Sequence, residues 1–267
     1  MGSSTASRLT LRTVALAYLG VLLIAPVGLI FYRTFEHGLS APFEAMTTPD
    51  ALHAFQLTLI TVAIAVPLNA IFGVGCALIL VRQRFRGRGL INAVIDLPFA
   101  ISPVVIGLSL ILVYGQTGWF GDWLAEHGIR IIFSTPGIVM ACIFVSLPFT
   151  VREVMPVLQE IGTEQEQAAS TLGANPWQTF WRVTLPSIRW GVGYGVVLTT
   201  ARVLGEFGAV TIVSGNITGQ TQTLPLFVES QYRNFNITGA YAAAIVLALV
   251  AFATLFAMNR FKPKEGT

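Results

Sequence analysis

The sequence contains six long apolar segments, and their length restricts the folds that the chain can adopt. Charged residues make up only 11% of the 267 residues, whereas a soluble domain of this size carries roughly 25%. A helix of about 20 apolar residues is long enough to cross a bilayer, and the continuous apolar runs favour helices over alternating strands. We therefore expect an all-α membrane protein with one transmembrane domain over residues 1–267. The six predicted spans are 11–32, 53–81, 90–114, 136–158, 190–213 and 238–259.

The distribution of Lys and Arg predicts the orientation of the spans, because cytoplasmic loops carry an excess of both. With the N-terminus inside, the outer side keeps only Arg33, Arg130 and Arg233. We therefore expect both termini in the cytoplasm and the first span to be an uncleaved anchor. The net charge of +3 then reflects topology and contact with lipid headgroups, and nucleic acid is not an expected partner. The basic residues assigned to the inner side are Arg8, Arg12, Arg82, Arg84, Arg86, Arg88, Arg152, Arg182, Arg189, Arg260, Lys262 and Lys264.

The inner loop at 159–189 contains a helix-forming pattern of its own. Thr163 and Glu166 have the spacing of a capping box, in which each side chain satisfies the other residue's backbone N–H. A helix is therefore expected over 164–172. Gly173 is placed to end it, because glycine adopts the left-handed conformation of a helix stop without penalty.

A second short helix is expected directly after Gly173. Asn175 caps it and Pro176 takes its first position, where a missing N–H costs nothing; Leu185-Pro186 is expected to end it. Three aromatic residues spaced i, i+3 and i+4 fall on one face: Trp177, Phe180 and Trp181. Spacing alone leaves two interpretations open. The rings anchor the helix at the membrane surface, or they dock in a groove of a soluble partner.

The same loop resembles the EAA loop of ABC-importer permeases, which in that family contacts the ATP-hydrolysing subunit. The pattern is two alanines, three residues, a glycine, nine residues, and an aliphatic residue two positions before Leu-Pro. Two positions depart from it: the family's leading glutamate is Gln167 and its usual isoleucine is Val183. The resemblance therefore does not carry over any ion pair made by that glutamate. The residues assigned by it to the ATPase contact are Gln167, Ala168, Ala169, Gly173, Trp177, Phe180, Trp181, Leu185 and Pro186.

Two further stretches are similar to the permeases of sulfate and molybdate importers. Residues 96–108, DLPFAISPVVIGL, resemble their third span, and residues 202–210, RVLGEFGAV, resemble their fifth. Residues 182–190, RVTLPSIRW, followed by GVVLT, look closest to W-type chains of sulfate/thiosulfate importers. The resemblance extends from about residue 15 to residue 258. It implies a permease for sulfate or thiosulfate, with molybdate or tungstate as the alternative.

The resemblance also implies an assembly in the bacterial cytoplasmic (inner) membrane. Its other parts are a second permease (T-type or another copy of this chain), two ATPase subunits inside and an external sulfate-binding protein. The chain has no GxxxxGK[ST] loop to cradle nucleotide phosphates. ATP and Mg are therefore expected in the ATPase, and this chain is expected to be non-catalytic and without a cofactor. Cys76 and Cys142 fall within predicted spans, so neither a disulfide framework nor a metal site is expected.

Arg202 and Glu206 lie four residues apart near the middle of the fifth predicted span, where a charge is costly and normally faces protein or water. Arg202 either lends positive potential to an oxyanion path or forms a neutral pair with Glu206 that fixes packing. The second interpretation is favoured because Glu206 would cancel most of the field. Other candidates for the path are the hydroxyls of Ser102, Thr199, Thr200 and Ser214, although hydroxyls on membrane helices more often bond their own backbone.

The third predicted span carries signals for a kink at Ser102 and Pro103 and for close helix approach at Gly107. A backbone opened at Pro98 or Pro103 would expose N–H groups to an anion, whereas a bent helix would not; the bent helix is the favoured alternative. Asp96 is expected to be a helix-end partner, because a carboxylate repels sulfate. The arginines of segment 82–88 are interpreted as topology determinants.

Two other classes of protein fit the sequence less well. An intramembrane protease needs a histidine base or an HExxH zinc motif, but His37, His53 and His127 lie in outer loops or at a span edge and HExxH is absent. An ion-coupled secondary transporter would show inverted repeats. No such symmetry is visible, and this class also leaves the aromatic inner loop unexplained.

Overall fold

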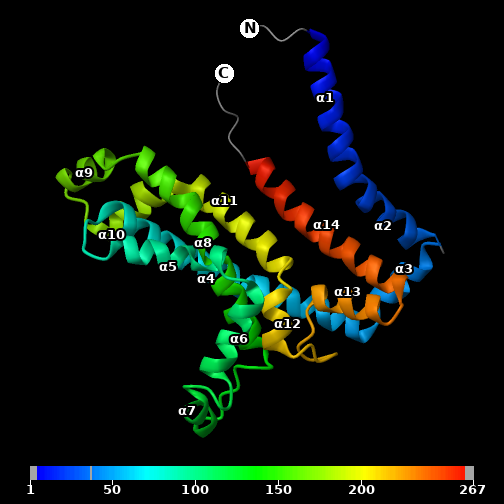
Figure 1. Cartoon of the computed structure of the whole chain (residues 1–267). Coiled ribbons are helices and arrows are strands. Elements are labelled where there is room, and N and C mark those ends of the chain that lie inside the picture. Colours follow the sequence, from blue (N-terminus) through cyan, green and yellow to red (C-terminus); the bar gives the residue numbers. More distant parts are fainter. Residues whose placement is uncertain (1–4, 37, 262–267) are drawn as a thin grey trace.

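The computed structural model describes residues 5–36 and 38–261, and these residues form helices joined by turns, without a strand (Figure 1). The helices are α1 (Thr5–Leu19), η1 (Gly20–Ile24), α2 (Ala25–Phe35), α3 (Ser40–Met46), α4 (Pro49–Arg82), α5 (Arg88–Ala100), α6 (Pro103–Tyr114), α7 (Gly121–Glu126), α8 (Thr135–Glu160), α9 (Glu164–Thr171), α10 (Pro176–Thr179), η2 (Phe180–Thr184), α11 (Leu185–Leu204), α12 (Gly208–Ser214), α13 (Leu224–Arg233) and α14 (Ile237–Phe261). The segments η1 and η2 are single π-helical turns. The all-helical prediction is confirmed for the described residues.

Four continuous helical segments are long and apolar enough to cross a membrane: Leu11–Phe35, Pro49–Arg82, Thr135–Glu160 and Ile237–Phe256. They coincide with the first, second, fourth and sixth predicted spans. The other two predicted spans are each a pair of helices, with α5 and α6 bent by 114° and the α11–α12 pair bent by 56°. The structure therefore has four candidate spans, or up to six if each bent pair crosses once.

The third predicted span, 90–114, is broken where a kink was expected. Ile101 and Ser102 have extended backbone, with ψ angles of 137° and 135°, and α6 begins at Pro103. Proline has no N–H to donate and pushes the preceding residue out of the helical region, so one helix cannot run through this point. The favoured bent helix is wrong, and the backbone is opened at Pro103.

The core of the molecule is a close packing of α4, α8 and α11 around Thr150. A Cβ added to Gly73 of α4 would lie 2.6 Å from Thr150 Cβ, and one added to Gly195 of α11 would lie 2.8 Å from Thr150 Cα. Small residues let membrane helices approach closely, and hydrogen bonds then join them. Asn69 of α4, fully buried, donates to Ser146 Oγ at 2.7 Å on α8.

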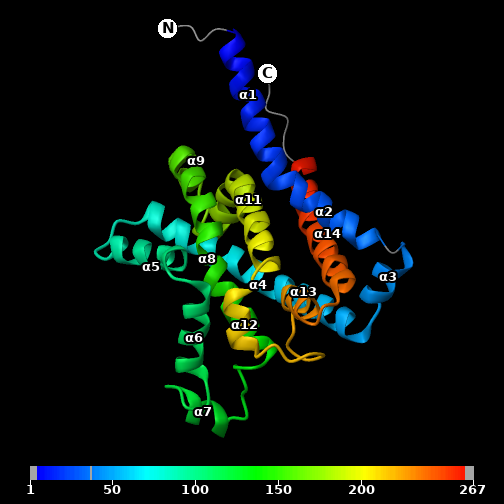
Figure 2. The ribbon, with the colours of Figure 1, turned by 45° about the vertical axis from the view of Figure 1, so that its right-hand side comes forward.

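Helices α6 and α12 lie side by side next to this core (Figures 1 and 2). A Cβ on Gly107 would lie 2.8 Å from Ala209 O, so the predicted close approach at Gly107 is confirmed. Pro103 and Gly208 also meet, because a Cβ on Gly208 would lie 3.1 Å from Pro103 Cβ. The break in the third predicted span and the break in the fifth are therefore neighbours.

The first helical segment stands apart from this core in both ribbon views (Figures 1 and 2). Its most apolar stretch has no buried residue, and α2 contacts the rest of the chain mainly through α14. The short helices α3, α7 and α13 were not predicted. Among them, α13 packs on α4 and α14, with Leu224, Leu226 and Phe227 buried.

Candidate functional site

The EAA-like loop, residues 159–189, has one helix before Gly173 and a second that starts after it, as the sequence predicts. Helix α9 ends at Thr171, and Gly173 follows with φ +87°. This is the left-handed region that glycine enters without steric cost. Asn175 Oδ1 accepts from Gln178 N at 2.8 Å and Gln178 Oε1 accepts from Asn175 N at 3.0 Å. This reciprocal capping box fixes the start of α10 at Pro176.

The predicted capping box at the start of α9 is wrong. Thr163 precedes the helix, but its side chain makes no capping hydrogen bond to the backbone. Instead Gln167 Nε2 donates to Thr163 Oγ1 at 3.1 Å. The Glu166 side chain is unavailable for the box because it points to other elements of the structure. Gln167, where the family pattern has glutamate, is exposed and makes its contact within its own helix.

Glu166 is the carboxylate of α9 that contacts other helices. Arg82, the last residue of α4, approaches it with Nε at 3.1 Å from Oε2 and with Nη2 donating to Oε1 at 3.2 Å. Thr184 of η2 also donates to Oε1, at 2.8 Å. Arg82 Nη1 donates further to Leu158 O at 3.1 Å, in the last turn of α8. Arg82 therefore makes specific contacts, which its interpretation as a topology determinant did not foresee.

The aromatic face of the second helix is present and largely exposed. The ring centroids of Trp177 and Trp181 lie 5.6 Å apart, and that of Phe180 lies 6.3 and 5.4 Å from these two. Trp177 is 70% exposed and Trp181 50% exposed, whereas Phe180 packs on the core cluster that contains Leu158 and Ile188. Phe180 thus holds the helix to the core while the two indoles remain available for another surface.

The prediction that Leu185-Pro186 ends this helix is wrong. Helices α10, η2 and α11 form one continuous segment, Pro176–Leu204. At the junction Leu185 N donates to Phe180 O, a bond across five residues that belongs to a π-turn. A wider turn shifts the hydrogen-bond register, and Pro186, which has no N–H to donate, enters the first turn of α11. The helix of the fifth predicted span therefore begins at Pro176, inside the segment that was expected to be a loop.

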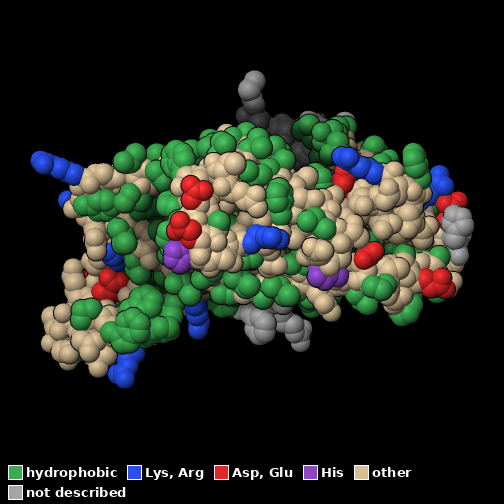
Figure 3. All heavy atoms as spheres, turned by 90° about the horizontal axis from the view of Figure 1, so that it is seen from below, with side chains coloured by type: hydrophobic (Ala, Val, Ile, Leu, Met, Phe, Trp, Pro, Cys, Tyr) green, Lys and Arg blue, Asp and Glu red, His purple; other side chains and the backbone are tan. Residues whose placement is uncertain are grey.

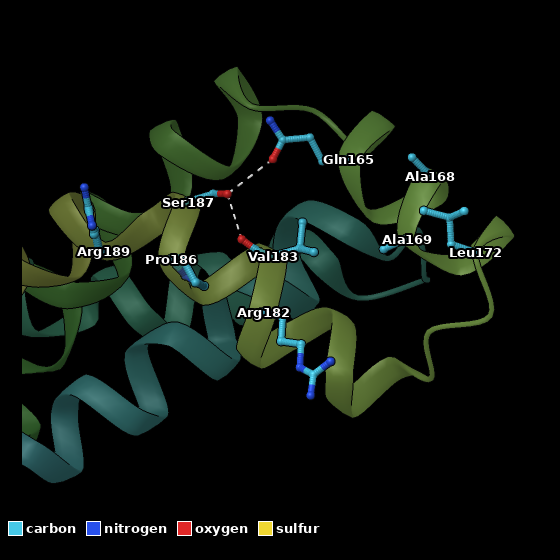
Figure 4. Close-up of a pocket in the computed structure, with 9 residues that line it drawn as sticks. All are labelled: Gln165, Ala168, Ala169, Leu172, Arg182, Val183, Pro186, Ser187 and Arg189. Carbon is cyan, nitrogen blue, oxygen red and sulfur yellow. Dashed lines mark hydrogen bonds between the residues drawn. The ribbon is translucent and has the colours of Figure 1, made fainter.

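A groove of about 640 Å³ opens between α9 and the start of α11 (Figure 4). Ser187 Oγ donates to Val183 O at 2.7 Å within its own helical segment. Across the groove, Ser187 Oγ lies 3.4 Å from Gln165 Oε1. The alanines of the EAA pattern line it together with Leu172, which is 89% exposed. The lining residues are Gln165, Ala168, Ala169, Leu172, Arg182, Val183, Pro186, Ser187 and Arg189.

Arg202 and Glu206 form an ion pair of 2.6 Å between Nη1 and Oε2. They do not share one helix, because α11 ends at Leu204 and α12 begins at Gly208; the predicted continuous span 190–213 is wrong in this respect. The buried Glu206 carboxylate also accepts from Ala209 N at 2.9 Å, which caps the first turn of α12. Carboxylates are favourable at helix N-termini, so the glutamate holds both the arginine and the new helix at the break.

The hydroxyl candidates for an anion path are mostly engaged in hydrogen bonds. Thr200 donates to Val196 O at 2.7 Å in its own helix, and Thr199 Oγ1 lies 3.1 Å from Thr150 Oγ1. Ser214 is buried and accepts from Asn216 N at 3.0 Å. Ser102 is exposed and precedes α6 without a capping bond. The structure thus brings Arg202 and Glu206 together, while Thr199, Thr200 and Ser214 already have hydrogen-bond partners.

Asp96 pairs with an arginine, as a helix-end partner would. Arg152 Nε donates to Asp96 Oδ1 at 2.8 Å, and Arg152 Nη2 contacts Oδ2. The pair joins α5 to α8. Like Arg82 with Glu166, these residues are far apart in the chain, and no local pattern in the sequence pairs them.

Comparison with known proteins agrees with this architecture. Residues 69–266 match the family described as binding-protein-dependent transport system inner membrane component. The chain belongs to this family. Together with the apolar helices, membership places the chain among membrane proteins.

The chain is similar to two transport proteins in sequence and to one solved structure in fold. The chain is 52% identical over 256 residues to a sulfate transport system permease protein CysW of Synechocystis sp. (strain ATCC 27184 / PCC 6803 / Kazusa), covering 96% of this chain and 93% of that protein. It is 36% identical over 252 residues to a sulfate transport system permease protein CysT of Escherichia coli (strain K12), covering 94% and 91%. A chain of a bacterial ABC transporter involved in the import of the acidic polysaccharide alginate superposes with a TM-score of 0.79 over 96% of both chains. At 18% identity, this last likeness shows the fold alone.

Proposed function

We propose that this chain is a transmembrane permease subunit of an ATP-driven ABC importer for sulfate, with thiosulfate as a second substrate. The single observation that carries the proposal is the near full-length similarity to a CysW-type sulfate permease protein. The resemblance of residues 96–108 and 202–210 to sulfate permeases agrees with it. The chain acts as one permease domain that forms half of the path. Neither a molybdate permease nor an ion-coupled transporter is favoured by these relatives.

The proposed topology has six spans with both termini in the cytoplasm of a bacterium, across its inner membrane. Each bent pair, α5–α6 and α11–α12, then counts as one crossing. The start of α1, the end of α14 and α9 lie toward one end of the molecule (Figures 1 and 2), which supports an even number of crossings. The face seen from the opposite end has a few arginine side chains scattered among hydrophobic and acidic ones (Figure 3).

The EAA-like loop is the proposed contact with one of two ATPase subunits. Two observations support it: Trp177 and Trp181 are exposed on a helix that Phe180 fixes to the core, and aromatic residues on rigid supports dominate many protein interfaces. ATP and Mg belong to that partner, so this chain has no catalytic role. When the ATPase dimer closes, the loop moves with it and the permease opens outward. The anion then enters from an external sulfate-binding protein.

The proposed anion path passes the junction of the two breaks. Helix α6 begins at Pro103 and α12 at Gly208, and these two starts are in contact. The N-terminus of a broken membrane helix favours anionic groups; that of α6 has no side-chain cap, whereas the Glu206 carboxylate already accepts from the first turn of α12. Ser102 is the exposed hydroxyl at this junction, whereas the Arg202–Glu206 pair holds the geometry of the break. A second permease, of the CysT type or another copy of this chain, completes the path.

Uptake of labelled sulfate by membrane vesicles that contain the complete importer tests the proposal. We expect uptake that requires ATP and the external binding protein and that thiosulfate reduces more than molybdate or phosphate does. Uptake driven by an ion gradient in the absence of ATP would contradict it. Stronger competition by molybdate than by sulfate would assign the chain to the molybdate type.

A further inference from the structure

Four elements of the chain meet around the ion pair of Arg82 and Glu166. Arg82 is the last residue of α4, donates to the carbonyl of Leu158 near the end of α8, and pairs with Glu166 of α9. Glu166 also accepts from Thr184 of η2. The Arg82 and Glu166 side chains are only 16% and 22% exposed. A fork of donors on a planar guanidinium fixes its partners in direction as well as distance. The end of α4 and the EAA-like loop are therefore held at a set angle.

This contact singles Arg82 out from its neighbours. Within the described residues, Arg84, Arg86 and Arg88 have no ion pair, and Arg84 is exposed. On α9, the same contrast separates Glu166 from Glu164, which is exposed and unpaired there. The two ends of the pair are 84 residues apart in sequence, so it exists only in the folded chain.

The pair borders a pocket that the exposed indoles do not line. A cavity of about 370 Å³ adjoins it, lined by Glu166, Thr184 and Phe180 together with Leu78 of α4. Trp177 and Trp181 are not among its lining residues. The loop therefore contacts the core of the permease through Glu166 and Phe180, while Trp177 and Trp181 are exposed.

We propose that the Arg82–Glu166 pair, with Thr184, transmits movement of the EAA-like loop to α4 and α8; this rests on the proposed docking of an ATPase on the loop. Without the pair, the loop stays joined to the path through its chain connections to α8 and α11 and through the packing of Phe180 on the core. With it, a displacement of α9 also acts directly on the end of α4, which Arg82 holds to the last turn of α8. Arg82 and Glu166 are positioning residues: they touch neither nucleotide nor anion, and they set how far ATPase closure moves the path.

The experiment compares Glu166→Gln with Glu164→Gln in the complete importer. Glu166→Gln keeps the shape of the side chain but removes its charge. We expect sulfate uptake per ATP hydrolysed to fall about tenfold, within the range typical of coupling between sites, while the ATPase still co-purifies in normal amount. Glu164→Gln should leave both quantities unchanged. Arg82→Gln should repeat the effect of Glu166→Gln, and Arg84→Gln should not.

A milder variant keeps the test decisive if these changes reduce the amount of folded protein. Thr184→Val preserves the ion pair and removes only its link to η2, so uptake per ATP should fall about fivefold, at the lower end of that range. An unchanged ratio in Thr184→Val and Glu166→Gln would overturn the inference. So would loss of the ATPase from Glu166→Gln, because the residue would then belong to the docking surface. Failure of the unaltered importer to bind an ATPase would instead overturn the proposed function.

Discussion

The EAA-like loop and the break at 205–207 each pair a glutamate with an arginine where helices are interrupted. They differ in which side chains are exposed and in how far apart the paired residues are in sequence. The loop exposes two indoles and pairs its glutamate with a distant helix end. The break buries its glutamate and pairs it with an arginine four residues away. A buried local pair serves the fold of its own segment. An exposed apolar face on a firmly held helix is typical of a docking surface. Changes at the two places should therefore affect different measurements.

The largest effect is expected at the break. Glu206→Leu leaves Arg202 without its counter-charge and removes the cap of α12, and breaking a buried pair by removing one partner costs about 3 kcal/mol or more. Thermal unfolding in detergent should show the loss. The double variant Arg202→Gln/Glu206→Gln removes both charges, so we expect much smaller destabilisation and unchanged transport. A folded double variant that no longer transports sulfate would place Arg202 in the anion path instead.

The next largest effect is expected on the exposed face of the loop. Trp177→Asp replaces an indole with a charge, and loss of an aromatic anchor costs about 2 kcal/mol of binding, or about 30-fold in affinity. Co-purification of the ATPase should fall accordingly, with normal amounts of permease in the membrane. Trp177→Phe keeps a ring and is the control. Normal co-purification of Trp177→Asp would remove the face from the docking surface.

A smaller effect is expected at the turn between the two loop helices. Gly173 has φ +87° with no heavy atom within 4 Å of an added Cβ, so the cost of a side chain there is one of backbone conformation. Gly173→Val should cost about 1–2 kcal/mol and weaken ATPase binding by misplacing α10. Asn tolerates the left-handed region, so Gly173→Asn should be close to the unaltered chain. Equal binding by the Val and Asn variants would exclude a role for the turn.

The smallest effect is expected where the loop departs from the family pattern. Gln167→Glu restores the family's carboxylate at an exposed position, and exposed charges contribute only about 0–1 kcal/mol. We expect uptake and ATPase binding to change by less than about twofold, because Glu166 already supplies the carboxylate that contacts the core. A large gain in ATPase affinity, measured by titration, would mean that the docking surface itself lacks a charge at residue 167.

Local signals in the sequence predicted the local structure well. Gly173 and the cap at Asn175 follow from backbone preference and short-range hydrogen bonds, and the structure has both. The apolar runs predicted helices at the right places for the same reason. The pairing of Arg202 with Glu206 could also be predicted, because the two residues are four positions apart.

What the sequence could not predict depends on distant parts of the chain. Thr163 and Glu166 have capping-box spacing, but Arg82 and Thr184 offer Glu166 stronger partners, and neither is near in sequence. Leu185-Pro186 reads as a helix stop, yet a π-turn carries the helix through it. The proline that begins α6 was recognised, but the size of the bend there depends on the packing of α6 on α12. The site residues inferred from resemblance stay predictions until the assembly is tested.

The continuity of Pro176–Leu204 has a mechanical consequence. This segment spans 29 residues by its bounds, which at about 1.5 Å per residue makes a rod about 43 Å long. One end carries the indoles and the other reaches the break beside Glu206. Tilting such a rod by about 5° displaces its far end by about 4 Å, roughly the diameter of a small anion. In the proposed mechanism, a small rocking movement of the loop would therefore shift the far end of this helix enough to open a path for the anion, without unfolding of any helix.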